Sequence, residues 1–416
     1  MLVTIQLKRK PVACPVCRGQ FIGVKDYRKR TIVHSVLNGV ECRLIYRRRR
    51  YRCKTCNKSF NEESPFVRKQ KRMSILTENQ VLKDLKLPNE TFTTIAYRYY
   101  MSTTNVIDLF DRHVSISRGE FSSVVCIDEF YLGKHGVAGK YACVFLDFVK
   151  NEIIDILPTR RKYYLLHYFQ SIPQKELEKV RFVSIDMWDT YRDIARIVFK
   201  KAVVCVDSFH VMWNINQALM KLRIRVMNRY EKDKIEYYLL KKFNFLLMKN
   251  GDDVIYNEPR FNHRLDRYIN YQGLLKLVLD IDEDLSAAYQ LKEMYSRFNR
   301  KATFETAESQ LHSILDAFKI ANIPEYQEIV KMLKKWKKEI INSFHWFDGR
   351  RISNGILESK NARIKVILKN ANGYGNFDRL RTKIMYCLNE NSAPSLNDSY
   401  PSKRYKLGKR GKYNKQ

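Results

Sequence analysis

Three acidic residues lie in sequence contexts that suit metal chemistry. Asp128 in VVCIDEF and Asp186 in FVSIDMW end apolar, β-branched runs that are typical of buried strands, and Glu358 in NGILESKNARIK lies on a polar face of an expected helix. Carboxylates gathered from separate elements can hold two divalent metals against a phosphodiester. The competing interpretations are a helix N-cap for Asp186 and a solvated helix face for Glu358.

Further polar residues stand beside these acids. Asp207 and His210 close the next apolar run, AVVCVDSFHV, where they are either structural or neighbours of the site. On the expected helix, Asn361 and Lys365 follow Glu358 at i+3 and i+7, so all three face one direction. A carboxylate, an amide and an ammonium on one face suit a metal and a phosphate.

Two Cys-x-x-Cys pairs occur near the amino terminus, Cys14 with Cys17 and Cys53 with Cys56. Four thiolates on two turns supply the tetrahedral sulfur set of structural zinc, which replaces a core that a short segment cannot build. Redox chemistry is the alternative, but no βαβ unit accompanies the pairs. The odd total of nine cysteines fits a reducing compartment better than a disulfide framework.

A cationic strand is expected between the two cysteine pairs. Arginines crowd the stretch from Tyr46 to Arg52, and we expect them to contact phosphates while the tyrosine rings lie along the sugar–phosphate backbone. A solvated strand edge that discourages pairing is the alternative. The expected DNA-binding arginines are Arg47, Arg48, Arg49, Arg50 and Arg52.

Residues 73–114 have helical spacing that predicts a helix-turn-helix. Ser102 or Thr103 would cap its second helix, and the polar residues Thr103, Thr104 and Asn105 at that helix start would contact DNA. A helical hairpin with a packing role only is the alternative.

Composition points to a polyanionic partner. The 416 residues include 77 Lys and Arg against 44 Asp and Glu, a net charge of +33 that is spread over the whole chain. The hydrophobic content of 45% supports a globular fold of several domains. The start lacks the apolar core of a signal peptide, and no apolar run reaches the roughly 20 residues that cross a bilayer. A soluble intracellular protein is therefore expected, with nucleic acid as its partner and no membrane.

The order of elements predicts several domains. After the zinc module, three hairpin-like strands and then αβαβ are the order expected of a ribonuclease H-like α/β sheet. A long stretch that is dense in Leu, Lys, Tyr and Glu predicts an all-helical insertion. The expected divisions are a zinc-binding β module (1–68), a helix-turn-helix (69–118), the first part of the catalytic domain (119–214), the insertion (215–345), the final catalytic helices (346–392) and a basic disordered tail (393–416).

Together these motifs resemble a bacterial DDE transposase of the ISL-three insertion-sequence family, whose sheet element Asp/Cys-x-x-His is shared with Mutator-like transposases. The resemblance is carried by RYRCKTC, IDEF, SIDMWDTY, VDSFHV, NGILESKNARIK and GYGNFDRLRTKI. It implies that Asp128, Asp186 and Glu358 are the acidic triad, with Asp207 as the alternative second member beside His210. It also implies two Mg²⁺ or Mn²⁺ ions at the triad.

By the same resemblance, the protein binds the terminal inverted repeats of an insertion sequence, cleaves the DNA and transfers the 3′ ends to target DNA. Double-stranded DNA is then the partner, a homo-oligomer forms the synaptic complex, and the protein works at the bacterial nucleoid in the cytoplasm. The competing functions are a non-catalytic DNA-binding regulator and a ribonuclease H-like nuclease.

Overall fold

The chain forms two compact units. The computed structural model describes residues 1–35, 39–133, 139–254 and 257–395. One unit comprises Met1–Arg118 together with Ala362–Gln416, and the other is Gly119–Asn361. Most of the expected basic tail, residues 396–416, lies outside the described residues. None of the described helices is long and apolar enough to span a membrane.

The first unit begins with a small sheet. Strands β2 (Ile22–Val33) and β3 (Arg43–Cys53) form a long antiparallel hairpin, while β1 (Leu2–Ile5) and β4 (Ser59–Asn61) pair with opposite ends of β3. The buried side of β3 changes along its length, from Leu44 and Tyr46 at one end to Arg49, Tyr51 and Cys53 at the other. The two ends of β3 therefore pack against different neighbours.

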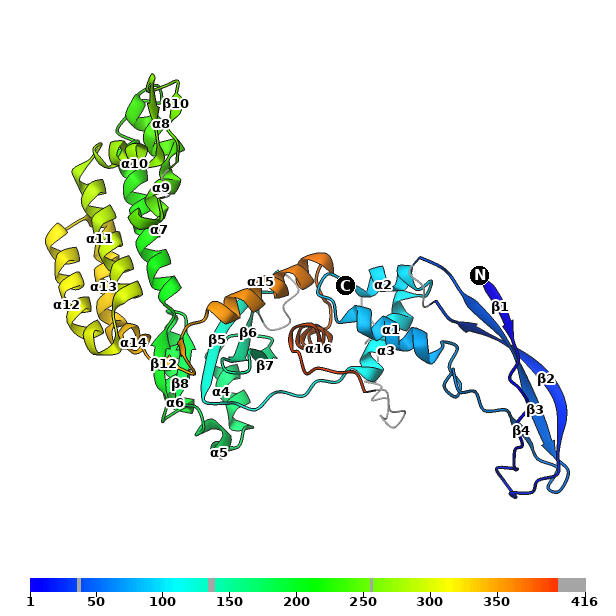
Figure 1. Cartoon of the computed structure of the whole chain (residues 1–416). Coiled ribbons are helices and arrows are strands. Elements are labelled where there is room, and N and C mark those ends of the chain that lie inside the picture. Colours follow the sequence, from blue (N-terminus) through cyan, green and yellow to red (C-terminus); the bar gives the residue numbers. More distant parts are fainter. Residues whose placement is uncertain (36–38, 134–138, 255–256, 396–416) are drawn as a thin grey trace, which may run out of the picture. The chain divides into compact units, whose positions relative to one another are not determined.

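Four helices form the second core of this unit (Figure 1). They are α1 (Ile75–Leu85), α2 (Phe92–Arg98), α3 (Thr103–His113) and α16 (Phe377–Leu388). Ser102 caps α3 by accepting the backbone N–H of Asn105, one of the two caps that the sequence allowed. In α16, Tyr386 is buried against the other three helices, and its hydroxyl donates to the Leu82 carbonyl.

The packing of α16 differs from the expected division of the chain. The sequence pattern assigned 346–392 to the catalytic domain, whereas Lys383 on α16 is fully buried and donates to the Leu85 carbonyl at the end of α1. Helical spacing shows which side of a helix is apolar and does not show which element covers it. Residues 362–395 therefore belong with the amino-terminal helices.

The second unit is a mixed α/β domain. Its five-stranded sheet contains β5 (Val124–Tyr131), β6 (Tyr141–Asp147), β7 (Glu152–Leu157), β8 (Phe182–Ile185) and β9 (Val203–Val206), in the order β7-β6-β5-β8-β9. The first three strands pair antiparallel, and β8 and β9 are parallel to β5. Helices α4 (Lys162–Gln170), α5 (Gln174–Leu177) and α6 (Asp189–Val198) connect them. Nearly every strand residue is buried, as expected for apolar runs covered on both faces.

A long helical segment, here defined as α7 to α14, separates β9 from the last helix of this unit. It was predicted as helical, but it also contains a short hairpin, β10 paired with β11, that the sequence analysis did not predict. Its elements are α7 (Ser208–Met227), α8 (Ile235–Lys242), α9 (Asn244–Met248), η2 (Gly251–Asp253), β10 (Arg260–Asn262), β11 (Arg267–Ile269), α10 (Tyr271–Leu279), α11 (Glu283–Lys301), α12 (Phe304–Ala321), η3 (Pro324–Tyr326), α13 (Gln327–Lys335) and α14 (Lys337–Asn342). The hairpin β12 (Trp346–Phe347) and β13 (Arg350–Arg351) then leads to α15 (Gly355–Asn370).

Candidate functional site

Asp128 lies near the end of β5 and is almost fully buried. Its Oδ1 accepts the Glu129 backbone N–H at 2.7 Å, and its Oδ2 accepts the side-chain amide of Asn361 at 2.8 Å. Burial, with a further contribution from the negative charge of Asp186, raises the pKa of Asp128 to about 7. The carboxylate thus sits where an additional positive charge would be favourable.

Asp186 immediately follows β8, the neighbour of β5 in the sheet. Its Oδ1 accepts the backbone N–H of Trp188 at 3.1 Å, which shapes the turn into α6. Burial, followed by the negative charge of Glu129, raises the pKa of Asp186 to about 7. Because β5 and β8 are parallel neighbours, their carboxyl ends lie at the same edge of the sheet, which brings Asp128 and Asp186 close enough to interact electrostatically.

Asp207, His210 and Glu358 form a tight group. Asp207 follows β9 and precedes α7, His210 lies in the first turn of α7, and Glu358 lies in the first turn of α15. One ligand atom from each residue lies within 4.8 Å of the others. Asp207 Oδ2 and Glu358 Oε1 are buried and have no hydrogen-bond partner among the described residues. Two orphaned carboxylate oxygens beside an imidazole fit a divalent cation.

The two groups of acids are coupled through charge. Burial and then the negative charge of Asp207 raise the pKa of Glu358, and Asp207 also contributes to the raised pKa of Asp186. The expected triad paired Glu358 with Asp128 and Asp186. In the described residues Glu358 forms a 4.8 Å group with Asp207 and His210, and Asp128 and Asp186 are not members of that group.

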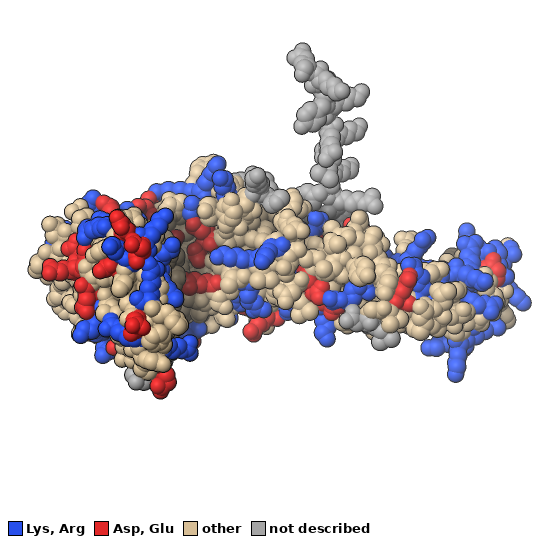
Figure 2. All heavy atoms as spheres, turned by 90° about the horizontal axis from the view of Figure 1, so that it is seen from above, with Lys and Arg blue, Asp and Glu red and all other residues tan. Residues whose placement is uncertain are grey.

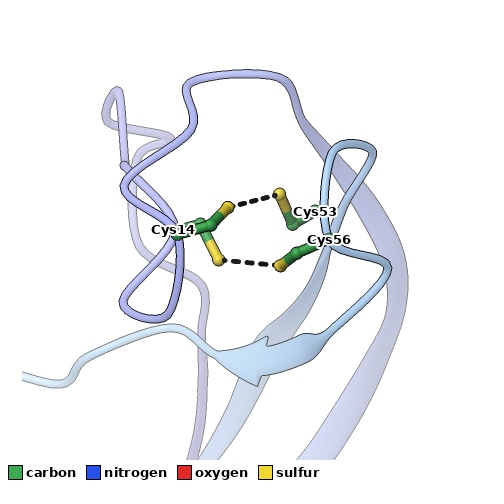
Figure 3. Close-up of side chains that lie close together, drawn as sticks. Cys14, Cys53 and Cys56 are labelled. Carbon is green, nitrogen blue, oxygen red and sulfur yellow. Dashed lines mark hydrogen bonds between the residues drawn. The ribbon is translucent and has the colours of Figure 1, made fainter.

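The four amino-terminal cysteines also come together (Figure 3). Cys14 Sγ lies 3.6 Å from Cys56 Sγ, and Cys17 Sγ lies 3.6 Å from Cys53 Sγ. All four thiols are free, and their sulfur atoms lie within 4.8 Å of one another. Zinc–sulfur bonds of about 2.3 Å in a tetrahedron place sulfur atoms roughly 3.8 Å apart, so the observed set fits one zinc ion.

Comparison with known proteins places this chain in a family. Residues 125–384 match the ISL3 family described as "Transposase", and residues 10–56 match the "zinc-finger of transposase IS204/IS1001/IS1096/IS1165". The chain belongs to the ISL3 family of transposases. It is also similar to the "Transposase for insertion sequence element IS1001" of Bordetella parapertussis, with 21% identity over 379 residues that cover 89% of this chain and 88% of that relative.

The zinc ribbon of this transposase has local features that suit metal binding. The backbone N–H of Cys56 lowers the pKa of Cys53 to about 6, because a hydrogen bond to the thiolate stabilises its charged form. Gly19 lies against Thr55, where a Cβ would approach the Thr55 hydroxyl to 3.0 Å. His34 and Cys42, the other ligand types in this region, are outside the group of four sulfurs among the described residues.

The expected DNA-binding arginines have different environments in the transposase. Arg49 is buried and pairs with Glu62, and Arg50 pairs with Asp26. Arg48 donates to the Glu62 carbonyl. Of the five, Arg47 and Arg52 are the exposed ones.

The tyrosines of the same strand differ from the expectation as well. Tyr46 and Tyr51 were expected along a sugar–phosphate backbone, but both are buried in the module. Because the buried side of the strand changes near its middle, Tyr46 and Tyr51 are both buried although an odd number of positions separates them. Even so, Figure 2 shows Lys and Arg crowded over the zinc ribbon, at the right of the view, whereas the helical segment carries both signs of charge.

The remaining expected site residues are placed as follows. Thr104 and Asn105 are exposed at the start of α3, and Thr103 is half-buried there. Asn361 contacts Asp128 as described above. Lys365 is exposed further along α15 and belongs to the first compact unit.

A cluster that the sequence did not predict, here called the clamp, connects β5, which carries Asp128, to the turn after β8, which carries Asp186. Glu129 pairs with Arg160 and accepts a hydrogen bond from the Tyr191 hydroxyl at 3.0 Å. The Arg160 guanidinium also lies 4.5 Å from the ring centroid of Trp188 and 4.3 Å from that of Tyr141. Glu129 is adjacent to Asp128 in the sequence, and Trp188 follows Asp186 by two residues. The clamp therefore connects the two segments that carry these acids. Neighbouring residues on a strand face opposite sides, which explains why Glu129 has partners different from those of Asp128.

Asn354 was also missed as a link between elements. Its backbone N–H donates to Asp207 Oδ1 at 3.2 Å, and its side chain donates to the Ile127 carbonyl at 3.1 Å. Asn354 and Asn361 therefore hold the start of α15 against β5 on either side of Glu358.

Proposed function

We propose that this transposase cleaves DNA by metal-dependent phosphodiester hydrolysis and transfers the resulting 3′ ends to target DNA. The observation that carries the proposal is the gathering of acids from β5, β8, β9 and α15 in a desolvated site, with their pKa values raised. Ionised carboxylates crowded in this way are most stable when a cation neutralises them. A divalent cation in such a site can catalyse phosphodiester cleavage. The net charge of +33 supports a nucleic-acid substrate for that reaction.

We assign Asp128, Asp186 and Glu358 as metal ligands, with Asp207 and His210 completing the site beside Glu358. The orphaned oxygens of Asp207 and Glu358 are the structural reason to expect a divalent cation there. Mg²⁺ or Mn²⁺, when bound, would supply activation of water and stabilisation of the leaving 3′ oxygen. Asn361 orients the Asp128 carboxylate through its side-chain amide.

The proposed sheet type is ribonuclease H-like. Three antiparallel strands that follow one another in the sequence are succeeded by two parallel strands reached through helices, which is the expected order for that fold. The segment α7–α14, which is helical apart from the β10–β11 hairpin, would then be an insertion between Asp207 and Glu358.

We further propose that the first unit recognises the terminal inverted repeats. The zinc ribbon supplies Arg47 and Arg52, and α2 and α3 act as a helix-turn-helix that presents Thr104 and Asn105. Because transposition joins two DNA ends, we also propose a homo-oligomeric synaptic complex, which the resemblance to the family implies as well.

The test is incubation of the purified protein with labelled duplex that carries an element end, together with Mg²⁺ and a target plasmid. We expect nicks at the 3′ ends followed by joining to the plasmid. Asp128→Asn should abolish both steps and leave end binding intact. Asp193→Asn, which changes an exposed carboxylate paired with Lys162, is the matched control and should behave as the wild type.

Three results would contradict the proposal. Cleavage by Asp128→Asn at the wild-type rate would remove Asp128 from the site. Nicking without joining would indicate a nuclease, and binding without nicking by the wild type would indicate a DNA-binding regulator.

A further inference from the structure

The far end of the helical segment carries a surface that the cleavage reaction does not use. Figure 1 shows α8 and β10 at the end of this segment that is remote from the sheet. A groove here is lined by four cations and two aromatic residues, with no carboxylate among the described residues that line it. Its lining residues, here called the tip groove, are Lys232, Tyr237, Tyr238, Lys241, Lys242 and Arg264.

The tip groove is held in shape by contacts between α8 and the hairpin. The Arg264 guanidinium lies 5.1 Å from the Tyr238 ring centroid and donates to the Asp233 carbonyl at 2.7 Å. The Tyr238 hydroxyl donates to Asn262 Oδ1 at 3.3 Å, which ties α8 to β10. These contacts pre-form the groove before any ligand arrives.

The cations of the tip groove are not neutralised by nearby acids. Among the described residues, none of its four cations has a carboxylate within ion-pair distance, 4.0 Å. Other arginines of the same segment do form ion pairs: Arg225 pairs with Asp284 and Glu325, and Arg229 pairs with Asp282. The free positive charge of the segment's end is therefore available to an anionic ligand.

Two aromatic rings stand exposed on the adjoining hairpin. Phe261 and Tyr268 are directly opposite each other on β10 and β11, with ring centroids 5.2 Å apart. Phe261 is 41% exposed and Tyr268 is 73% exposed. An exposed pair of rings beside cations offers stacking surface together with phosphate contact, the combination that recognises single-stranded nucleic acid.

We propose that the tip groove and the ring pair bind unpaired nucleotides of the DNA substrate. Double-stranded DNA would use the cations but not the rings, because its bases are already stacked on one another. An apolar protein surface would use the rings but would not complement four unpaired cations. The inference rests on the proposed function in one respect only: strand cleavage creates a free end at the element, and the nucleotides at a free end can fray from the duplex.

The experiment measures binding of the full-length protein to a labelled oligothymidylate and to a labelled duplex of random sequence. The variant Phe261→Leu with Tyr268→Leu keeps the apolar contact across the hairpin but removes both stacking faces. We expect it to lower the single-strand affinity about tenfold or more and to leave the duplex affinity within about twofold. The matched control is Tyr163→Ala, which removes a tyrosine ring that is 84% exposed on α4.

A charge variant tests the groove independently of the hairpin's stability. Lys241→Gln with Lys242→Gln should weaken single-strand binding and make the logarithmic salt dependence of the affinity shallower by about 0.7 for each phosphate that the variant no longer neutralises. Its control is Lys331→Gln, because Lys331 is already paired with Glu328.

Several outcomes would overturn the inference. Single-strand affinity of the double Leu variant equal to that of the Tyr163→Ala control would exclude stacking. Equal decreases in duplex and single-strand affinity would indicate a general phosphate contact. Weakened binding to anionic phospholipid vesicles, with single-strand binding unchanged, would assign the surface to lipid. Asp128→Asn should retain single-strand binding, so a failure of the cleavage proposal is distinguishable from a failure of this one.

Discussion

The substitution Asp128→Asn should stabilise the metal-free protein while it abolishes cleavage. The pKa of Asp128 is raised from 3.8 to about 7, first by burial and then by neighbouring negative charge. A difference of this size corresponds to about 4 kcal/mol of unfavourable free energy for the ionised carboxylate in the native state. Asparagine has the same shape without the charge, so we expect a gain of about 1 to 4 kcal/mol in the free energy of unfolding at pH 8.

The hydrogen bonds of Asp128 can survive the substitution. The new side chain still accepts the Glu129 N–H through its oxygen, and its NH₂ group then faces Asn361. Asn361 Oδ1 is buried and has no hydrogen-bond partner within the described part of the chain, so a flip of the Asn361 amide lets this oxygen accept from the new NH₂ group. The charge is therefore removed with little change in packing.

The dependence of stability on pH shows in which direction the Asp128 charge acts. The native state binds the Asp128 proton more tightly than the unfolded state, so this carboxylate lowers stability as the pH rises from about 4 to about 7. Below pH 4 both states carry the proton, and the penalty disappears. The advantage of Asp128→Asn should accordingly be full above pH 7 and vanish near pH 4.

The assay is denaturant unfolding in the presence of a chelator, followed by tryptophan fluorescence. All four tryptophans, Trp188, Trp213, Trp336 and Trp346, belong to the unit Gly119–Asn361, so the signal reports on the domain that holds the site. Saturating Mg²⁺ should then stabilise the wild type more than the variant. A variant that is destabilised at pH 8 by as much as at pH 4 would refute the electrostatic reasoning.

Three further substitutions test other parts of the structure. Cys53→Ser should lose zinc, measured as bound metal per protein, whereas Cys42→Ser should keep it, because Cys42 is buried outside the sulfur group; equal zinc contents would exclude Cys53 as a ligand. Arg160→Ala should raise the Mg²⁺ concentration needed for half-maximal nicking about tenfold, and nicking should recover at high Mg²⁺. An unchanged Mg²⁺ requirement would show that the clamp does not position the metal ligands. Asp207→Asn should reduce nicking at least tenfold relative to the Asp193→Asn control, whereas wild-type activity would leave Asp207 with only a structural role, as acceptor of the Asn354 backbone N–H.

Local sequence patterns anticipated much of the fold. The apolar, β-branched runs around Asp128 and Asp186 do form buried strands, because such side chains fill a sheet that is covered on both faces. The two Cys-x-x-Cys pairs do meet, since each pair sits on its own tight turn and the β2–β3 hairpin brings the turns together. These features depend on neighbours in sequence or on one hairpin.

Features that depend on distant partners were not predictable in the same way. The burial of Arg49 requires Glu62, which reaches it only once β4 has paired with β3. The proximity of Asp207 to Glu358 depends on how the start of α15 docks on the sheet, and more than a hundred residues separate the two acids. Periodicity assigns a side chain to a face, but the partner on that face is a tertiary property.

The packing of α16 on α1–α3 has a consequence for incomplete copies of the gene. A reading frame interrupted between the codons for Glu358 and Phe377 would still encode every acidic residue of the site and all four zinc-ribbon cysteines. Its product would nevertheless leave an uncovered apolar surface where Tyr386 and Lys383 normally insert. Such a product would be prone to aggregation and proteolysis rather than acting as a stable competitor for the element's ends.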